Sequence, residues 1–227
     1  VNFTGSFNTA RIFGDYLYNK ENKRENFPRF IAETGGKDFV IAHHSADAAV
    51  VATALLRGAF EFQGQKCSAA SRAYIPSNIA DEVKKIMIDE MSKFKMGTVE
   101  EFTNFINAVI DEKSFDKIAS YIDGASKDKN VKIIAGGKYD KSKGYFIEPT
   151  LIEAKDPGYI TMCEEIFGPV LTFHVYNESK FSETLELVDS TSPYALTGSI
   201  IARDRSAIEL ATRKLRNAAG NFYINDK

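Results

Sequence analysis

The sequence lacks the features of a metal-binding, disulfide-stabilised or membrane-spanning protein. Its only two cysteines, Cys67 and Cys163, lie far apart and form neither a metal-ligand nor a disulfide pattern, so a reducing compartment fits best. His43 and His44 are adjacent and therefore make a poor metal pair, and we expect both to be solvated loop residues. No apolar run approaches the roughly 18 residues that a membrane-spanning helix needs.

An excess of charge of one sign is also missing. The 29 basic and 31 acidic residues leave a net charge of −2, which gives no support to a nucleic-acid or acidic-membrane partner. From these 227 residues we expect no signal or transit segment, and the sequence starts at Val1, inside an apolar strand-like run. We therefore expect it to be a piece of a longer protein.

What is present suits a packed domain in which strands alternate with helices. With 44% hydrophobic residues the chain can bury a sizeable core. Hydrophobic periodicity predicts strands over 1–4, 29–33, 37–42, 72–76, 131–135, 145–151 (interrupted at Pro149), 170–176, 197–202 and 221–224, and helices over 7–18, 47–60, 79–94, 114–126, 181–189 and 205–215. This alternation predicts an α/β fold with a mostly parallel sheet.

Cys67 is a candidate nucleophile, and Glu33 is a candidate base. Cys67 follows a glycine-bearing turn between a predicted helix and a predicted strand, and Lys66 beside it would favour the thiolate. Glu33 stands at the end of a predicted strand, just before a pair of glycines. The competing interpretations are a buried structural cysteine, which is common for free thiols, and an ordinary surface carboxylate.

Gly5 and Ser6 join a predicted strand to a predicted helix. Free backbone N–H groups at such a helix start suit an anion such as a phosphate. From these two residues alone, an ordinary connection between a strand and a helix is the favoured interpretation. The sequence contains no G-x-G-x-x-G motif.

Three runs in this order resemble the signatures of the aldehyde dehydrogenase superfamily: ETGGK at 33–37, GQKC at 64–67 and EEIFGPV at 164–170. The run LRNAAGNFYINDK at 215–227, with FTGS at 3–6 and CSA at 67–69, is similar to members that oxidise L-glutamate γ-semialdehyde, the open form of 1-pyrroline-5-carboxylate. The resemblance covers essentially the whole chain, but less than half of the family's chain.

The resemblance implies a division of the chain near Thr34. Residues 34–227 would form the catalytic domain, with a mostly parallel sheet and flanking helices. Residues 1–33 would be the last part of a Rossmann-like cofactor domain.

For catalysis, the resemblance implies that Cys67 adds to the aldehyde carbon as a thiolate and later carries a thioester. Glu33 would be the general base for hydrolysis, a task that partial burial would favour by raising its pKa. Ser68, next to the nucleophile, would help to hold the polar end of the substrate. Cys163 is interpreted as a structural thiol.

For the cofactor, the resemblance implies NAD, although nothing in the three runs distinguishes NAD from NADP. Glu165 would accept hydrogen bonds from the hydroxyls of the nicotinamide ribose, and Phe167 would pack near the nicotinamide. Gly5 and Ser6 would lie at the phosphate or nicotinamide-ribose side. Without the resemblance, Glu165 is an ordinary solvated acid. Lys37 and Lys66 could tune the thiolate, but lysines of this kind are more often solvated.

The remaining expectations concern the complete protein. It would bind a small-molecule substrate, form a homo-oligomer and serve proline catabolism, in the mitochondrial matrix if the source is a eukaryote and in the cytoplasm otherwise. The 227-residue piece alone should not turn over, because it lacks most of the cofactor-binding sheet. Two alternatives remain: an aldehyde dehydrogenase of broader specificity, and a catalytically dead structural domain.

Overall fold

A computed structural model describes residues 1–19, 26 and 28–226. Its centre is a seven-stranded sheet with the strand order β11-β10-β3-β4-β9-β8-β5. The neighbouring strands are parallel except for β5, which is antiparallel to β8. The strands are β3 (Asp38–Ala42), β4 (Ala70–Pro76), β5 (Val131–Ala135), β8 (Thr150–Ala154), β9 (Val170–Tyr176), β10 (Thr197–Ile201) and β11 (Asn221–Ile224).

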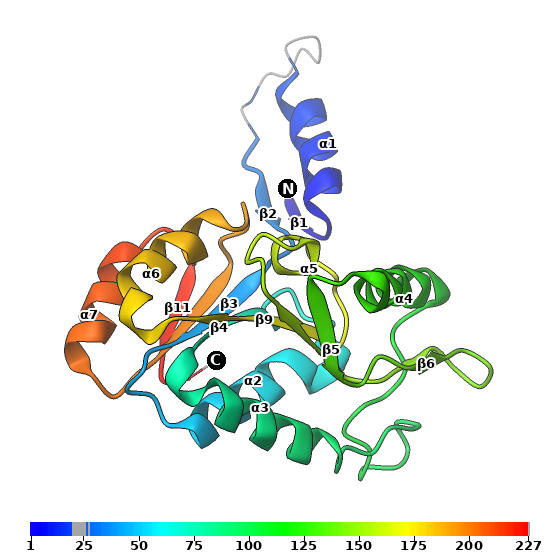
Figure 1. Cartoon of the computed structure of the whole chain (residues 1–227). Coiled ribbons are helices and arrows are strands. Elements are labelled where there is room, and N and C mark those ends of the chain that lie inside the picture. Colours follow the sequence, from blue (N-terminus) through cyan, green and yellow to red (C-terminus); the bar gives the residue numbers. More distant parts are fainter. Residues whose placement is uncertain (20–25, 27, 227) are drawn as a thin grey trace.

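Helices cover both faces of this sheet (Figure 1). Successive residues of a strand point to opposite faces. Val40 and Ala42 pack with α2 (Ala48–Phe60) and α3 (Ser77–Met91), whereas Phe39 and Ile41 pack with α6 (Phe181–Ser190) and α7 (Arg205–Lys214). A third cluster packs α4 (Glu112–Lys127) against β5 and β8. The result is a three-layer α/β/α arrangement, which confirms the predicted α/β fold with a mostly parallel sheet and flanking helices.

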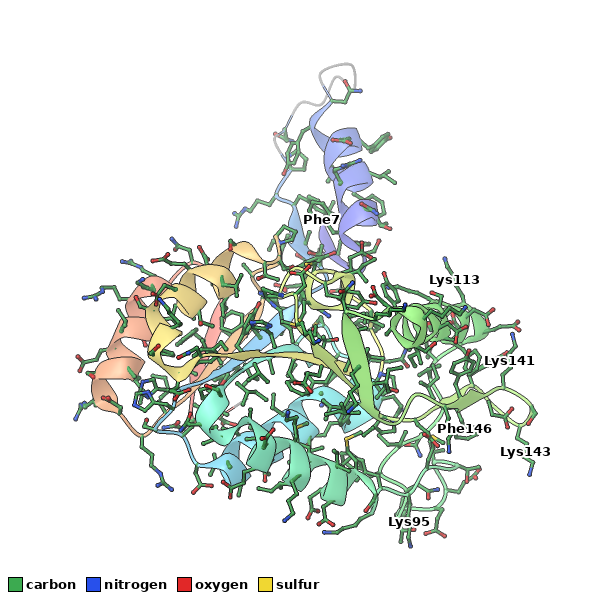
Figure 2. All side chains as sticks on the ribbon, in the orientation of Figure 1. Phe7, Lys95, Lys113, Lys141, Lys143 and Phe146 are labelled. Atoms are coloured by element: carbon green, nitrogen blue, oxygen red, sulfur yellow. The ribbon has the colours of Figure 1, made fainter. Side chains whose placement is uncertain are left out.

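The described part of residues 1–33 forms a small unit that projects from this body (Figure 1). Here β1 (Asn2–Thr4) pairs in parallel with β2 (Ile31–Glu33), and α1 (Phe7–Tyr18) lies between them in the sequence. Phe7 lies where α1 meets the body (Figure 2). We call the described part of 1–33 the projecting unit and 34–226 the body; a domain boundary near Thr34 stays a prediction.

The other elements are short. They are the hairpin strands β6 (Tyr139–Asp140) and β7 (Phe146–Ile147), the helix α5 (Ile160–Cys163), and the 3₁₀ turns η1 (Glu61–Gly64) and η2 (Glu178–Lys180). Among the described residues, no helix has the length and apolar character needed to cross a membrane.

The run predicted over 145–151, with an interruption at Pro149, is two strands, β7 and β8, because Pro149 lies between them and has no N–H for the ladder. One expectation for the histidines was wrong. His43 is buried rather than solvated, since it directly follows β3 in the core. Its ring packs edge-on against Phe181 at 4.6 Å, and Nδ1 lies 2.9 Å from Ser45 Oγ.

Candidate active site

The segment that carries Cys67 leaves α2 through an unusual turn. Phe62, Gln63 and Gly64 have φ values of 55°, 58° and 63°, which is the left-handed region that side chains other than glycine rarely adopt. This turn reverses the chain between α2 and β4 and leaves Cys67 exposed at its end. The exposed thiol agrees with the expectation of a cysteine that can meet a substrate.

Two glutamines hold this turn in place. Gln63 Oε1 accepts a hydrogen bond from the Asn107 backbone N–H at 3.1 Å. Gln65 Oε1 accepts one from the Ile110 N–H at 2.9 Å, and Gln65 Nε2 lies 3.5 Å from the Phe167 carbonyl oxygen. Because satisfied side-chain hydrogen bonds can stabilise a strained backbone, we assign the shape of the nucleophile turn to these contacts. Sequence reasoning missed them, since glutamine carries no positional signal of its own.

The glycine pair at 35–36 brings the separate motifs into contact. The Gly36 N–H donates to Glu165 Oε1 at 2.9 Å, and a Cβ on Gly35 would overlap the Glu165 carboxylate. A Cβ on Gly36 would overlap the Cys67 carbonyl oxygen and lie 2.5 Å from Asp38 Oδ2. Both glycines are therefore required by the close approach of three segments.

These contacts build a cleft of about 350 Å³ between the projecting unit and the body. It brings together six of the seven predicted site residues: Gly5, Ser6, Glu33, Cys67, Glu165 and Phe167. Ser114 and Lys117, both from α4, also line it and were not predicted. The only sequence signal for them was that α4 is amphipathic.

The EEIFGPV run forms one wall of this cleft. Glu165 is half-buried, and its backbone oxygen accepts a hydrogen bond from Lys117 Nζ at 2.8 Å. Phe167 has a φ of 60° and is 39% exposed, so its ring remains available to a ligand. Glu164 instead points to Tyr121, whose hydroxyl donates to it. Burial, helped by this carboxylate, raises the pKa of Tyr121 to about 12.

The opposite wall comes from the projecting unit. Ser6 is the N-cap of α1, and its Oγ accepts a hydrogen bond from the Thr9 N–H at 3.2 Å. The Gly5 N–H donates to the Glu33 carbonyl oxygen at 3.1 Å. The Glu33 residue is exposed, so the partial burial considered for it from the sequence is not present in this chain.

Ser68 lies outside the cleft. It lines a separate small hollow of about 70 Å³, together with Lys66, Asp38, Thr197 and Ser199 among others. Neighbouring residues of the chain thus face different spaces, with Cys67 toward the cleft and Ser68 toward the hollow.

The two lysines near the site, Lys66 and Lys37, differ in how far they are exposed to solvent. Lys66 is partly exposed, and its Nζ lies 3.2 Å from Glu61 Oε2. Lys37 is only 1% exposed, so the expectation that it is solvated was wrong. It directly precedes β3 in the core, and burial, assisted by the nearby Arg72 charge, lowers its pKa to about 7.

Cys163 has a different environment from Cys67. It is half-buried at the end of α5, where its thiol lies 3.4 Å from the Gly158 carbonyl oxygen. Burial raises its pKa. A thiol of this kind is less nucleophilic at neutral pH than an exposed one.

A larger hollow of about 730 Å³ lies within the projecting unit, between α1 and the segment that contains Phe30 and Ala32. None of the predicted site residues lines it. Within the described residues, no group of three or more His, Cys, Asp or Glu side chains is placed so that it could hold a metal ion. The 350 Å³ cleft is therefore the candidate active site.

Comparisons with known proteins cover the whole chain. The model of the aldehyde dehydrogenase family matches residues 1–227. The mitochondrial delta-1-pyrroline-5-carboxylate dehydrogenase of Dictyostelium discoideum is 52% identical over 233 residues, and the human protein of the same name is 47% identical over 228. Each alignment covers 100% of this chain but only 41% and 40% of the relative.

A solved structure gives the same result. The delta-pyrroline-5-carboxylate dehydrogenase from Mycobacterium tuberculosis, bound with NAD, superposes with a TM-score of 0.91 at 41% sequence identity. The match covers 99% of this chain and 41% of that one. The chain thus spans about two fifths of the length of the relatives it matches.

Proposed function

Because this chain belongs to the aldehyde dehydrogenase family, we propose that the complete protein oxidises L-glutamate γ-semialdehyde to L-glutamate with NAD. The observation that carries the proposal is the cleft that Cys67, Glu33 and Glu165 line together. These residues come from three distant motifs, and a thiol, a base and a ribose-binding carboxylate are the groups that thiol-dependent aldehyde oxidation needs.

Cys67 supplies the nucleophile. Its thiolate adds to the carbonyl carbon and forms a C–S bond, which gives a thiohemiacetal. After oxidation the same carbon is a thioester, and water attacks it while Glu33 takes the proton. The C–S bond then breaks, the acid leaves and the thiolate is restored. Backbone N–H groups beside Cys67 are available to stabilise the negative oxygen.

The residues of the cleft fit a nicotinamide nucleotide. Glu165 lines the cleft and uses Oε1 for the Gly36 N–H. A carboxylate has about four acceptor sites on its two oxygens, so this side chain can also accept from ribose hydroxyls. Phe167 offers an exposed ring, and Gly5 and Ser6 line the cleft at the start of α1. When bound, NAD would take up the hydride that leaves the carbon attached to Cys67.

The substrate assignment rests on the relatives, which are named delta-1-pyrroline-5-carboxylate dehydrogenases. 1-Pyrroline-5-carboxylate is the cyclic form of the semialdehyde. Ser68, on the hollow beside the nucleophile, would hold the polar end of the substrate. We further propose that the complete protein is a homo-oligomer that works in proline catabolism. A mitochondrial matrix location is supported by the mitochondrial relatives, with the cytoplasm as the alternative for a bacterial source.

The test is NADH formation by the complete protein with glutamate semialdehyde and with simple aldehydes. We expect a strong preference for the semialdehyde, and loss of NADH formation in Cys67→Ala but not in Cys163→Ala. Equal rates with simple aldehydes would favour the broader-specificity alternative. Thiol labelling of the unmodified protein separates the remaining alternative, because equal and slow labelling of the two cysteines would indicate a catalytically dead domain.

A further inference from the structure

A buried carboxyl group lies directly beneath the segment that carries Cys67. Asp38, the first residue of β3, is only 2% exposed. Its Oδ1 accepts a hydrogen bond from the Thr197 backbone N–H at 2.6 Å. Its Oδ2 is enclosed and has no hydrogen-bond partner within the described part of the chain. A buried oxygen in this state costs free energy unless it finds a donor or carries a proton.

The position of Asp38 Oδ2 indicates which group it can form a hydrogen bond with. A Cβ added to Gly36 would overlap both Asp38 Oδ2 and the carbonyl oxygen of Cys67, so the two oxygens face the same point of the glycine turn. Both are acceptors when the carboxyl is ionised, and they then repel each other. A protonated carboxyl has one O–H donor, which converts the same approach into an attractive one.

The surroundings favour the neutral form. Burial is the largest influence on Asp38 and raises its pKa to about 7, with a smaller contribution in the same direction from Glu165. The Thr197 hydrogen bond, Arg72 on β4 and the neighbouring Lys37 act in the opposite direction and do not outweigh burial. Lys66 lines the same small hollow as Asp38, and it is paired with Glu61.

We propose that Asp38 is a positioning residue: its neutral carboxyl ties the peptide carbonyl of Cys67 to β3, and its ionisation releases the nucleophile segment. The Oδ2–H donates to the carbonyl directly, or through a water in the adjoining hollow of about 70 Å³. The inference rests on the proposed function in one respect, that Cys67 is the nucleophile. Asp38 does not touch the reacting atoms and acts through the backbone of Cys67.

Hydrogen–deuterium exchange of the complete protein tests this proposal. We compare peptides covering 61–70 in the unmodified protein and in Asp38→Asn, whose amide is a permanent donor of the same shape. At about pH 6 the two should exchange alike, and at about pH 8.5 the unmodified protein should exchange about fivefold faster, the effect of one ordinary hydrogen bond. Asp189→Asn, at an exposed aspartate of α6, is the matched control and should follow the unmodified protein.

Equal exchange of the unmodified protein and Asp38→Asn at both pH values would overturn the proposal. If Asp38→Asn does not fold, the unmodified protein alone decides the question: the exchange of 61–70 relative to β9 must rise with pH through the titration of Asp38, and a constant ratio overturns the proposal. Neither readout requires substrate. A protein that shows the exchange difference but oxidises no aldehyde would sink the proposed function and leave the role of Asp38 standing.

Discussion

The body and the projecting unit are packed to very different degrees, and the candidate active site lies between them. In the body, Phe173 of β9 and Leu55 of α2 are 0% exposed. In the projecting unit, Phe7, Phe13 and Ile31 remain 54%, 43% and 56% exposed. The nucleophile therefore stands on a tightly packed support, whereas the proposed base Glu33 stands on a strand with little apolar cover of its own.

This difference indicates where the precision of the site comes from. A small two-stranded unit with exposed apolar side chains cannot fix Glu33 by its own packing. The link to the body is the glycine turn, where the Gly36 N–H donates to Glu165 and a Cβ on Gly36 would overlap the Cys67 carbonyl oxygen. We infer that the two regions contribute unequally, with the body fixing the nucleophile and the turn aligning the base to it. Four predictions test this comparison.

The largest effect, on kcat, should follow removal of the general base that the projecting unit contributes. Glu33→Gln in the complete protein should lower kcat by about 10²- to 10⁴-fold, the usual range for a lost general base. Because Cys67 would still react, mass spectrometry should show an acyl group accumulating on it. The matched control is Glu164→Gln, since this acid is bound to Tyr121 rather than directed into the cleft. If Glu33→Gln retained kcat, the cleft would need another base.

Truncating one phenylalanine in each region compares their packing directly. In the chain of residues 1–227, Phe173→Ala should lower the free energy of unfolding by about 3 to 5 kcal/mol, because its side chain is fully buried. Phe13→Ala should cost about 1 kcal/mol or less, since it is 43% exposed and its ring contact is with Phe3. Urea titration followed by circular dichroism measures both. Equal losses would contradict the contrast between the two regions.

The free energy of unfolding should also depend on pH, and the group responsible should lie in the body rather than in the projecting unit. The pKa of Asp38 is raised from 3.8 to about 7 in the folded state, so between these values the folded state keeps a proton that the unfolded state has lost. The contribution of Asp38 to the free energy of unfolding therefore falls as pH rises through this window and is level above it. Across this window, the ionisation of Asp38 should lower the free energy of unfolding by on the order of 2 to 4 kcal/mol.

The measurement is the free energy of unfolding from about pH 4 to about pH 8 for three proteins. Asp38→Asn should remove most of the decline that the unmodified chain shows. Glu33→Gln should retain it, because Glu33 is exposed. If Asp38→Asn declined as steeply as the unmodified chain, the buried carboxyl would not be the source of the pH dependence.

Much of the fold and the membership of the cleft could be predicted from the sequence, for identifiable reasons. Periodicity located α1 and α2 because each has a regular apolar face, and it located β9 as a short apolar run that is buried on both sides of the sheet. The three signature runs, with the FTGS run, identified six of the cleft residues because short motifs keep chemical groups together. The burial of Lys37 and His43 could not be predicted, since it depends on strands that are distant in sequence. Nor could the left-handed turn at Phe62, because that conformation is maintained by contacts made elsewhere.

The smallest effect should come from Lys66, the charge closest in sequence to the nucleophile. A lysine beside Cys67 could stabilise the thiolate, but Lys66 Nζ lies 3.2 Å from Glu61 Oε2 and is partly exposed. A cation that is already paired and solvated acts weakly on a neighbour. Lys66→Gln should therefore change the rate of Cys67 alkylation at neutral pH by less than about threefold, and added salt should reduce even that difference. A tenfold slower alkylation, unaffected by salt, would show that Lys66 and not the packed body is what activates the thiol.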